Sequence, residues 1–224
     1  MAGFRDEFER PDLFDSLLEI AEDLGLAACH VDRLLVGRSA MNGAWAFPMR
    51  DGAGKVVGIR LRRYRSKDKW SVGGSADGLF YDPDLEPERR AHLGIADREI
   101  VVVEGATDCI AAYSIGLPAV GRSSCGTGAA HLCALCSRLG VRRVTIVSDN
   151  DRAKYTEGTA TAPPRLARPG QDGARRLAKA LGREFRIVVP PAKDLREWVA
   201  RGLTADGFWS VAENVRFRNA RLQF

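Results

Sequence analysis

The sequence predicts an α/β protein in which a parallel-sheet domain follows a smaller α+β lobe. From residue 99 onward, continuous apolar segments such as EIVVVE (99–104) alternate with helical segments. Strands that are apolar at nearly every position are typical of a parallel sheet covered by helices on both faces. Before residue 83 the order differs, with helices first and strands after them. The 224 residues, 45% of them hydrophobic, are enough for one large domain or two small ones.

The first lobe begins with a predicted amphipathic helix over residues 11–24. In PDLFDSLLEIAEDL the leucines and the isoleucine fall near one face, and Gly25 supplies a stop. A shorter helix is predicted around HVDRLLV (30–36). The segments AWAFPM and VVGIRLRRYR flank the turn-forming DGAGK, which is the pattern of a β-hairpin.

The second lobe continues with a helix at 107–117, a strand at 141–148, a helix at 173–182 and a strand at 185–191. The polar, proline-containing PDLEPERRAHLG (83–94) is a predicted linker. A Thr/Ala/Pro-rich stretch at 152–170 is predicted as a long loop that interrupts this lobe. The predicted organisation is a helical N-terminal segment at 1–40, a basic α+β lobe at 41–97, an α/β domain at 98–205 and a C-terminal tail at 206–224.

The composition indicates a cytoplasmic protein with no membrane partner. The first residues, MAGFRDEFER, are too charged for a signal peptide, and the apolar runs are far shorter than a membrane span. A formal charge of +5 permits a polyanionic partner without requiring one.

The five cysteines predict free thiols and no zinc site. Cys133 and Cys136 form a single CxxC inside HLCALCSRL, which is a helical pattern, and no second pair stands at zinc-finger spacing. His131 has a poor ligand geometry on the same helix. Buried helical cysteines are the preferred interpretation.

Carboxylates follow the strands of the second lobe. Glu104 ends IVVVE, Asp149 and Asp151 follow VTIVS, and Asp194 follows FRIVVPPAK. Ligands bind at the carboxyl edge of open parallel sheets, so these acids are expected to converge there. Such a cluster repels itself unless a divalent cation neutralises it, and hard oxygen ligands favour Mg²⁺ or Mn²⁺ over zinc.

Each acidic motif also has an ordinary structural interpretation. Asp-Asn-Asp is a common turn sequence, and an acid after a strand is a common helix cap, as Thr107 and Asp108 could be here. Judged alone, SDND favours the turn. The combination of motifs, in order along the chain, favours a metal site.

Three motifs in this order resemble the TOPRIM domain of bacterial primases, topoisomerases and some nucleases. VVVEGATD resembles its glutamate motif, with Glu104, Gly105 and Asp108 in register. IVSDND resembles its paired-aspartate motif, and PPAKDLREWV resembles the Lys-Asp motif of primase members at Lys193 and Asp194. The resemblance covers roughly residues 98–205 and implies that this segment is a TOPRIM domain.

The preceding segment resembles the region before TOPRIM in DnaG-type primases. That region has a Phe-Pro strand, a glycine turn, a Gly-aromatic-Arg stretch, a Lys-aromatic element and a Leu-Phe pair, and this chain departs from it with Ile59 in place of the aromatic residue. The positions in this chain are Phe47, Pro48, Gly54, Gly58, Arg60, Lys69, Trp70, Leu79 and Phe80. SSCGTGAAH resembles the Gly-Thr loop of the same family, at Gly126 and Thr127.

The segment from residue 60 to residue 69 carries six cations and one acid, Asp68. On a strand, alternate residues share a face, so Arg60 and Arg62 are expected on one side and Leu61 on the other. The cations could bind phosphates, and Trp70 could stack on bases. A solvated edge strand is the alternative. The family resemblance favours a nucleic-acid or nucleotide groove facing the acids.

The resemblance implies the catalytic core of a phage- or plasmid-like DnaG-type primase, which synthesises an RNA primer on single-stranded DNA from nucleoside triphosphates. It implies catalytic roles for Glu104, Asp149 and Asp151. It also implies that these three residues and Asp194 bind the metal ions. The implied nucleic-acid or nucleotide contacts are Arg60, Arg62, Lys69, Trp70, Gly126, Thr127 and Lys193. Helices, not a zinc module, precede residue 44, and no helicase motif is present, so a replicative helicase is an expected partner.

Two alternatives remain. One is a TOPRIM nuclease that uses the same acids and metals, although the Gly-x-Arg and Lys-aromatic segment argues against it. The other is a non-catalytic single-stranded-DNA-binding accessory module, against which the complete acid set argues. A topoisomerase would need a strand-passage domain for which the chain has no room.

Overall fold

The computed structural model describes residues 13–39, 41–85, 99–157 and 165–219. In the N-terminal part the helices are α1 (Leu13–Leu24) and α2 (Ala28–Val31), with 3-10 turns at Asp32–Leu34 and Pro83–Leu85. The strands are β1 (Gly37–Ser39), β2 (Ala44–Arg50), β3 (Val56–Arg63), β4 (Lys69–Ser71) and β5 (Leu79–Phe80). Most of the predicted linker lies outside the described residues.

The second part alternates strands and helices, as the sequence predicts. Its strands are β6 (Glu99–Glu104), β7 (Ala119–Arg122), β8 (Arg143–Val147), β9 (Lys154–Thr156), β10 (Arg165–Ala167), β11 (Glu184–Val188) and β12 (Arg218–Asn219). Its helices are α4 (Ala106–Ser114), α5 (Ala129–Arg138), α6 (Pro169–Leu181), α7 (Leu195–Ala200) and α8 (Ala205–Glu213). Within the described part of the chain, no helix is long and apolar enough to cross a membrane.

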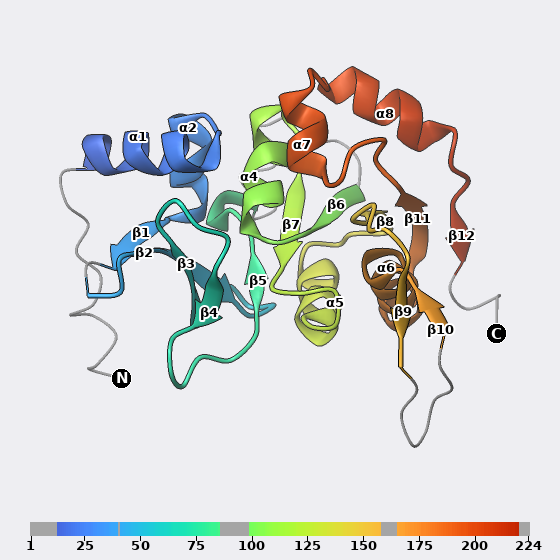
Figure 1. The fold of residues 1–224 in the computed structure, drawn as a ribbon. Helices are drawn as coiled ribbons and strands as arrows, with labels where there is room; N and C mark the ends of the chain where they lie inside the picture. Colours follow the sequence, from blue (N-terminus) through green and yellow to red (C-terminus); the bar gives the residue numbers. More distant parts are fainter. Residues whose placement is uncertain (1–12, 40, 86–98, 158–164, 220–224) are drawn as a thin grey trace.

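Ten of the described strands form one mixed sheet, in the order β12-β11-β8-β6-β7-β5-β2-β3-β4, with β1 paired to β2 (Figure 1). The four strands β11, β8, β6 and β7 are parallel, and the others pair antiparallel. The predicted α/β class with a parallel core is therefore confirmed. The sheet also runs without a break into the first lobe, because β5 pairs with both β7 and β2.

Helices cover both faces of the parallel strands, which explains their continuous apolar sequence. In β6, Val101 and Val103 point into a core shared with α4, α7 and α8, whereas Ile100 and Val102 point into a core shared with α5 and α6. Figure 1 shows the two groups of helices on opposite sides of the sheet. Successive residues of β6 thus contribute alternately to the two hydrophobic cores.

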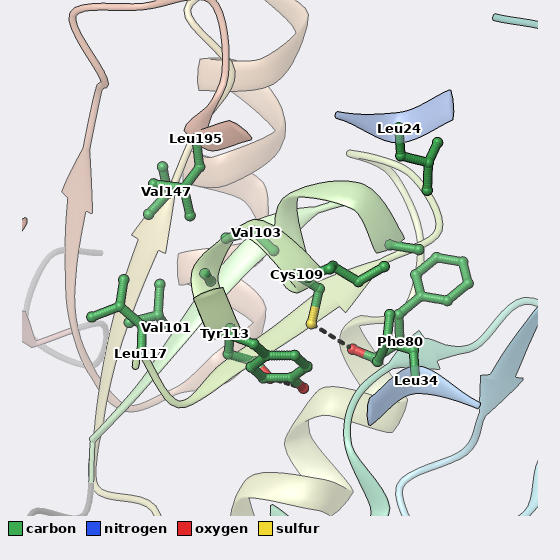
Figure 2. Close-up of a cluster of buried hydrophobic side chains, with 14 of the residues drawn as sticks. Leu24, Leu34, Phe80, Val101, Val103, Cys109, Tyr113, Leu117, Val147 and Leu195 are labelled. Atoms are coloured by element: carbon green, nitrogen blue, oxygen red, sulfur yellow. Dashed lines mark hydrogen bonds between the residues drawn. The ribbon is translucent and has the colours of Figure 1, made fainter. Parts of the chain in front are cut away.

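The two lobes are joined by buried polar contacts as well as by the sheet. The Arg33 guanidinium lies 2.7 Å from the Asp82 carboxylate and 4.1 Å from the centre of the Tyr113 ring. Tyr113 donates its hydroxyl proton to the Ala119 carbonyl and accepts from the Asp82 backbone N–H, both at 2.8 Å. In Figure 2 the Cys109 thiol donates to the Phe80 carbonyl at 3.3 Å. These contacts hold β5 against α4.

Two segments carry structure that the sequence analysis did not assign. The interrupting Thr/Ala/Pro-rich stretch contains the antiparallel β9–β10 pair, with residues 158–164 outside the described part. The segment assigned as a C-terminal tail forms most of α8, whose Phe208 is buried against Trp198, and then β12. The tail therefore contributes to the core.

All five cysteines are free. Cys136 is buried in α5 and Cys133 is half-buried on the same helix.

Candidate active site

The acids at the strand ends gather at one edge of the sheet. Glu104 is the last residue of β6, and Asp149 and Asp151 follow β8. Asp194 follows β11 and is the N-cap residue of α7. Because β6, β8 and β11 are parallel neighbours, their carboxyl ends lie side by side. All four side chains are partly buried.

A fifth carboxylate, Asp108, belongs to the same group. It lies in the first turn of α4, is 7% exposed, and accepts a hydrogen bond of 2.9 Å from the backbone N–H of Arg196. Burial, and then the charge of Asp194, raise the pKa of Asp108 to about 7. The sequence analysis placed Asp108 in the glutamate motif but did not count it as a site residue, because an acid in a first helical turn is also ordinary capping chemistry.

Asp149 is the carboxylate that responds most strongly to its neighbours. Burial raises its pKa to about 8, and the charges of Glu104, Asp108, Asp194 and Asp151 each contribute in the same direction. Burial also raises the pKa of Glu104, although the charge of Arg122 opposes this shift. Burial and the charges of neighbouring acids therefore disfavour the ionised forms of Glu104, Asp108 and Asp149.

Two of these carboxylates are held by helix N-termini. One oxygen of Asp151 accepts from the backbone N–H of Gly170 at 3.0 Å, at the start of α6. One oxygen of Asp194 accepts from the backbone N–H of Glu197 at 2.8 Å, at the start of α7. Between them, the Asn150 N–H donates to the Lys193 carbonyl at 2.7 Å, which ties the two loops together. The loops that carry the acids are thus fixed by the backbone.

Two glycines allow the backbone to come close at this edge. Gly105 has φ +94°, a conformation that other residues rarely adopt, and it turns the chain from β6 into α4. A Cβ atom on Gly170 would lie 2.8 Å from the Asp149 carbonyl oxygen and 2.9 Å from its Cβ. The start of α6 can therefore pack directly on Asp149 only with glycine at this position.

Arg122 is a buried cation beside the acids. It ends β7 opposite Glu104 in the strand register, is 4% exposed, and donates from Nη1 to the Cys125 carbonyl at 3.1 Å. Burial lowers the pKa of Arg122, whereas the charge of Glu104 raises it. Its Nε has no hydrogen-bond partner in the part of the chain that the structure describes. The sequence analysis did not predict this residue, because AVGR reads as the end of an ordinary strand.

The loop after β7 contains the predicted Gly126 and Thr127. The Thr127 hydroxyl lies 2.7 Å from the Ser123 hydroxyl and 3.1 Å from the Ser124 hydroxyl, and the Gly126 N–H donates to Ser124 at 3.3 Å. The loop leads into α5 at Gly128. It lies next to Glu104, which accepts a hydrogen bond from the Cys125 backbone.

The predicted basic residues face this loop and the glutamate turn. Arg62 pairs with Lys69 across β3 and β4, so the two side chains share a face with Arg60. The three line a pocket of about 40 Å³ together with Gly105 and Ser123. Partial burial lowers the pKa of Lys69, and the charge of Arg62 lowers it further. The structure thus brings the basic side chains to the acidic edge.

The other two predicted contacts, Trp70 and Lys193, do not line this pocket. Trp70 is on the opposite face of β4, packed against the buried cluster that contains Ile59 and Leu61, with the Arg63 guanidinium 5.3 Å from its ring. The structure therefore does not place Trp70 with Lys69. Lys193 is exposed beside Asp194, and its backbone N–H donates to the Glu197 carboxylate at 3.0 Å.

Within the described ranges, no three acidic, histidine or cysteine side chains are arranged closely enough to hold a metal ion. The site thus consists of neighbouring carboxylates, one buried arginine and a basic surface that faces them.

No protein-family model and no curated protein matches the sequence. The fold of this chain is similar to that of a class of solved structures, the DnaG-type primase catalytic cores. The DnaG catalytic domain bound to single-stranded DNA superposes with a TM-score of 0.64 at 18% identity, over 97% of this chain and 78% of that one.

Two further solved structures give the same result. The Escherichia coli primase catalytic core matches with a TM-score of 0.63 at 18% identity, over 93% of this chain and 75% of that one. The primase fragment of the bacteriophage T7 primase-helicase protein matches with a TM-score of 0.55 at 19% identity, over 84% of this chain and 71% of that one. The chain has the fold of a DnaG-type primase catalytic core.

Proposed function

We propose that this chain is the catalytic core of a DnaG-type primase, which synthesises a short RNA primer on single-stranded DNA. The observation that carries the proposal is the acid group around Asp149, which faces the cations of β3 and β4 on a primase-core fold. Carboxylates can bind the cations that accompany triphosphates, and the facing arginines can bind phosphates directly. The arrangement therefore suits nucleotidyl transfer.

The donor atoms of the site fit Mg²⁺ or Mn²⁺. The acids at this edge offer carboxylate oxygens, and hard divalent cations prefer oxygen. Burial, and then the charges of neighbouring acids, raise the pKa values of Asp108 and Asp149, and a bound cation would oppose both effects. We propose that Glu104, Asp149, Asp151 and Asp194 would hold the ion or ions after their side chains turn toward a common point, because no three of them are close enough in the described part of the chain. When bound, the cations would stabilise charge on the attacking and leaving oxygens.

Other roles in the reaction would be carried out by side chains of the protein itself. Glu104 is placed to accept the proton of the attacking 3′-hydroxyl or to help hold a cation, and both roles need its ionised form. Arg60, Arg62 and Lys69 would position the template or the triphosphate, since they line the pocket beside Gly105. The Gly126 and Thr127 loop lies beside Glu104 and would contact the nucleotide.

The proposed partners are single-stranded DNA and nucleoside triphosphates. A replicative helicase is a further proposed partner, and one structural neighbour is the primase fragment of a primase-helicase protein. The domain limits 98–205 and 41–97 remain predictions, because the continuous sheet gives no boundary between them.

The test is an incubation of the purified chain with single-stranded DNA, labelled nucleoside triphosphates and Mg²⁺, with products separated on a denaturing gel. We expect new short RNA products, and we expect the Asp149→Asn/Asp151→Asn variant to make none. The amides preserve shape but remove the charges that the ions need.

Other outcomes of this assay would indicate a different function. Shortened DNA in place of new RNA would indicate a nuclease that uses the same acids. Intact DNA that binds the protein without any product would indicate an accessory binding module. Equal product from the Asp149→Asn/Asp151→Asn variant would contradict the proposed roles of both aspartates.

The stability of the metal-free protein should depend on pH through these acids. Asp108 and Asp149 have pKa values raised to about 7 and about 8, above the ordinary value of 3.8. Their contribution to stability is therefore fully present below pH 3.8 and is lost as the pH rises through 7 to 8. We expect the Tm in EDTA to fall between about pH 5.5 and about pH 8.5, and Mg²⁺ to raise the Tm most at the higher pH.

Differential scanning fluorimetry of the wild type and of Asp149→Asn would measure this effect. The variant removes the group with the larger raised pKa, so its Tm should fall less over the same range and respond less to Mg²⁺. Parallel curves for the two proteins, with equal Mg²⁺ responses, would show that Asp149 does not resist ionisation as described.

A further inference from the structure

A second basic surface lies away from the pocket formed by β3 and β4. It is a groove of about 590 Å³ between α6, β11 and the segment that leads into β12. Figure 1 shows α6, β11 and β12 together at the end of the sheet opposite β3 and β4. We call it the α6–β12 groove. Its cationic lining residues are Arg175, Arg176, Lys179, Arg186, Arg216 and Arg218.

The charge of the α6–β12 groove is largely uncompensated. Among its described lining residues none is acidic. Arg186 is paired with Glu99 at 2.8 Å, and Arg175 is paired with Asp172 at 3.0 Å. Arg176, Arg216 and Arg218 are exposed, and they form no ion pair among the described residues. Arg176 on α6 and Arg216 and Arg218 near β12 thus line one groove, and these three arginines form no ion pair among the described residues.

The positions of Arg216 and Arg218 are set by the residue between them. The Phe217 ring lies 4.4 Å from the Arg186 guanidinium and 5.1 Å from that of Arg143. β12 pairs with β11 at Arg218 and Phe185. The ring anchors this segment, and its two arginine neighbours line the groove.

The floor of the groove offers apolar and polar contacts. Val189 is 46% exposed there, beside Ile187 and Val215. Gln171 is 6% exposed, lines the groove, and has a buried Oε1 atom with no hydrogen-bond partner among the described residues. An unsatisfied buried amide is costly and indicates a missing partner with a donor group.

The groove is connected to the acidic edge by α6. Gly170, at the start of this helix, packs on Asp149, and the charge of Arg176 acts on Arg122 and Cys125. A chain that leaves the acids along α6 would therefore enter the groove past Arg176.

We propose that the α6–β12 groove binds the phosphate backbone of a single-stranded nucleic acid. Exposed arginines would contact phosphates, the apolar floor would contact sugars or bases, and Gln171 would accept a hydrogen bond from a base or a hydroxyl group. The identity of the polymer rests on the proposed function. The binding itself requires neither nucleotides nor metal.

The test compares two double variants that remove the same charge. Arg216→Gln/Arg218→Gln changes the groove, and Arg142→Gln/Arg201→Gln changes two exposed arginines that do not line it. Binding of a fluorescent oligo-dT of about 16 nucleotides is followed by anisotropy across a salt series, without nucleotides or divalent ions. We expect the groove variant to bind about tenfold more weakly at about 50 mM salt, with a log–log salt slope reduced by about 1.4.

Equal affinities and equal salt slopes for the two double variants would overturn the proposal. Circular dichroism and Tm would establish that both are folded. If Arg216→Gln/Arg218→Gln does not fold, Arg176→Gln, an exposed change on α6, replaces it, with an expected slope reduction of about 0.7. Because the assay contains no nucleoside triphosphates and no divalent ions, a negative result leaves the primer-synthesis proposal intact. Failed primer synthesis likewise leaves this binding result intact.

Discussion

The Glu104→Gln variant is expected to lose nucleotidyl transfer by about 10²–10⁴-fold while remaining folded. Glu104 ends β6 at the acidic edge, and burial raises its pKa, so its ionised form is destabilised in the metal-free protein. An amide preserves the shape but can neither take a proton nor neutralise a divalent cation. The measurement is the initial rate of labelled dinucleotide formation at saturating template.

The stability of Glu104→Gln provides the accompanying control. Removal of a carboxylate with a raised pKa should leave the Tm in EDTA unchanged or higher, since one source of repulsion on Asp149 disappears. A variant with wild-type rate would remove Glu104 from the proposed chemistry. A variant with a much lower Tm would instead assign Glu104 a structural role beside Arg122.

The Glu99→Gln variant is expected to lower the free energy of unfolding by about 3 kcal/mol. Glu99 stands at the other end of the same strand and accepts from Arg186 at 2.8 Å and from the Thr145 hydroxyl. Arg186 is 5% exposed, and its Nη1 also donates to the Ala212 carbonyl at 2.9 Å. Removal of the carboxylate charge leaves a buried guanidinium without its counter-ion. Urea unfolding at equilibrium measures the loss.

A neighbouring ion pair supplies the matched control for Glu99→Gln. Arg143 and Glu184 lie 3.1 Å apart, and in the sheet register Arg143 is opposite both Glu99 and Glu184. Their side chains are 56% and 49% exposed, so Glu184→Gln should cost less than about 1 kcal/mol. Equal losses of unfolding free energy for the two variants would show that the burial of Arg186 does not determine the cost of Glu99→Gln.

Together, Glu104 and Glu99 show how one strand serves two purposes. The end of β6 at the carboxyl edge places a charge where other charges repel it, whereas the beginning places a charge where Arg186 compensates it. We propose that the first arrangement binds a cation, whereas the second stabilises the fold. Sequence alone shows only a glutamate at each end of an apolar segment.

Several features of the protein could be predicted from local pattern. Continuous apolar strands with intervening helices predicted the parallel core, because strands buried on both faces have no polar positions to alternate. The same pattern placed Glu104, Asp149, Asp151 and Asp194 at strand ends. The alternation in β3 placed Arg60 and Arg62 on the face opposite Leu61, which is the face that lines the pocket beside Gly105.

Other features could not be predicted because they depend on residues distant in sequence. β5 has two residues, too few for a strand pattern, yet it joins the two lobes into one sheet. The first turn of α4 could hold a cap or a site residue, and only the packing of α7 shows Asp108 buried beside Asp194. The sequence predicted that Trp70 could stack on bases, but the β3–β4 register places it on the face opposite Lys69.

The sequence by itself determined the order of the elements, the α/β class and the acids that end three neighbouring strands, because these follow from hydrophobic periodicity and from the shared direction of parallel strands. The tertiary structure alone decided the raised pKa of Asp149, the buried position of Arg122 and the convergence of α6 with β12 into a basic groove. Burial and long-range electrostatic interactions depend on which segments meet in space, and that is not a property of any local stretch of residues.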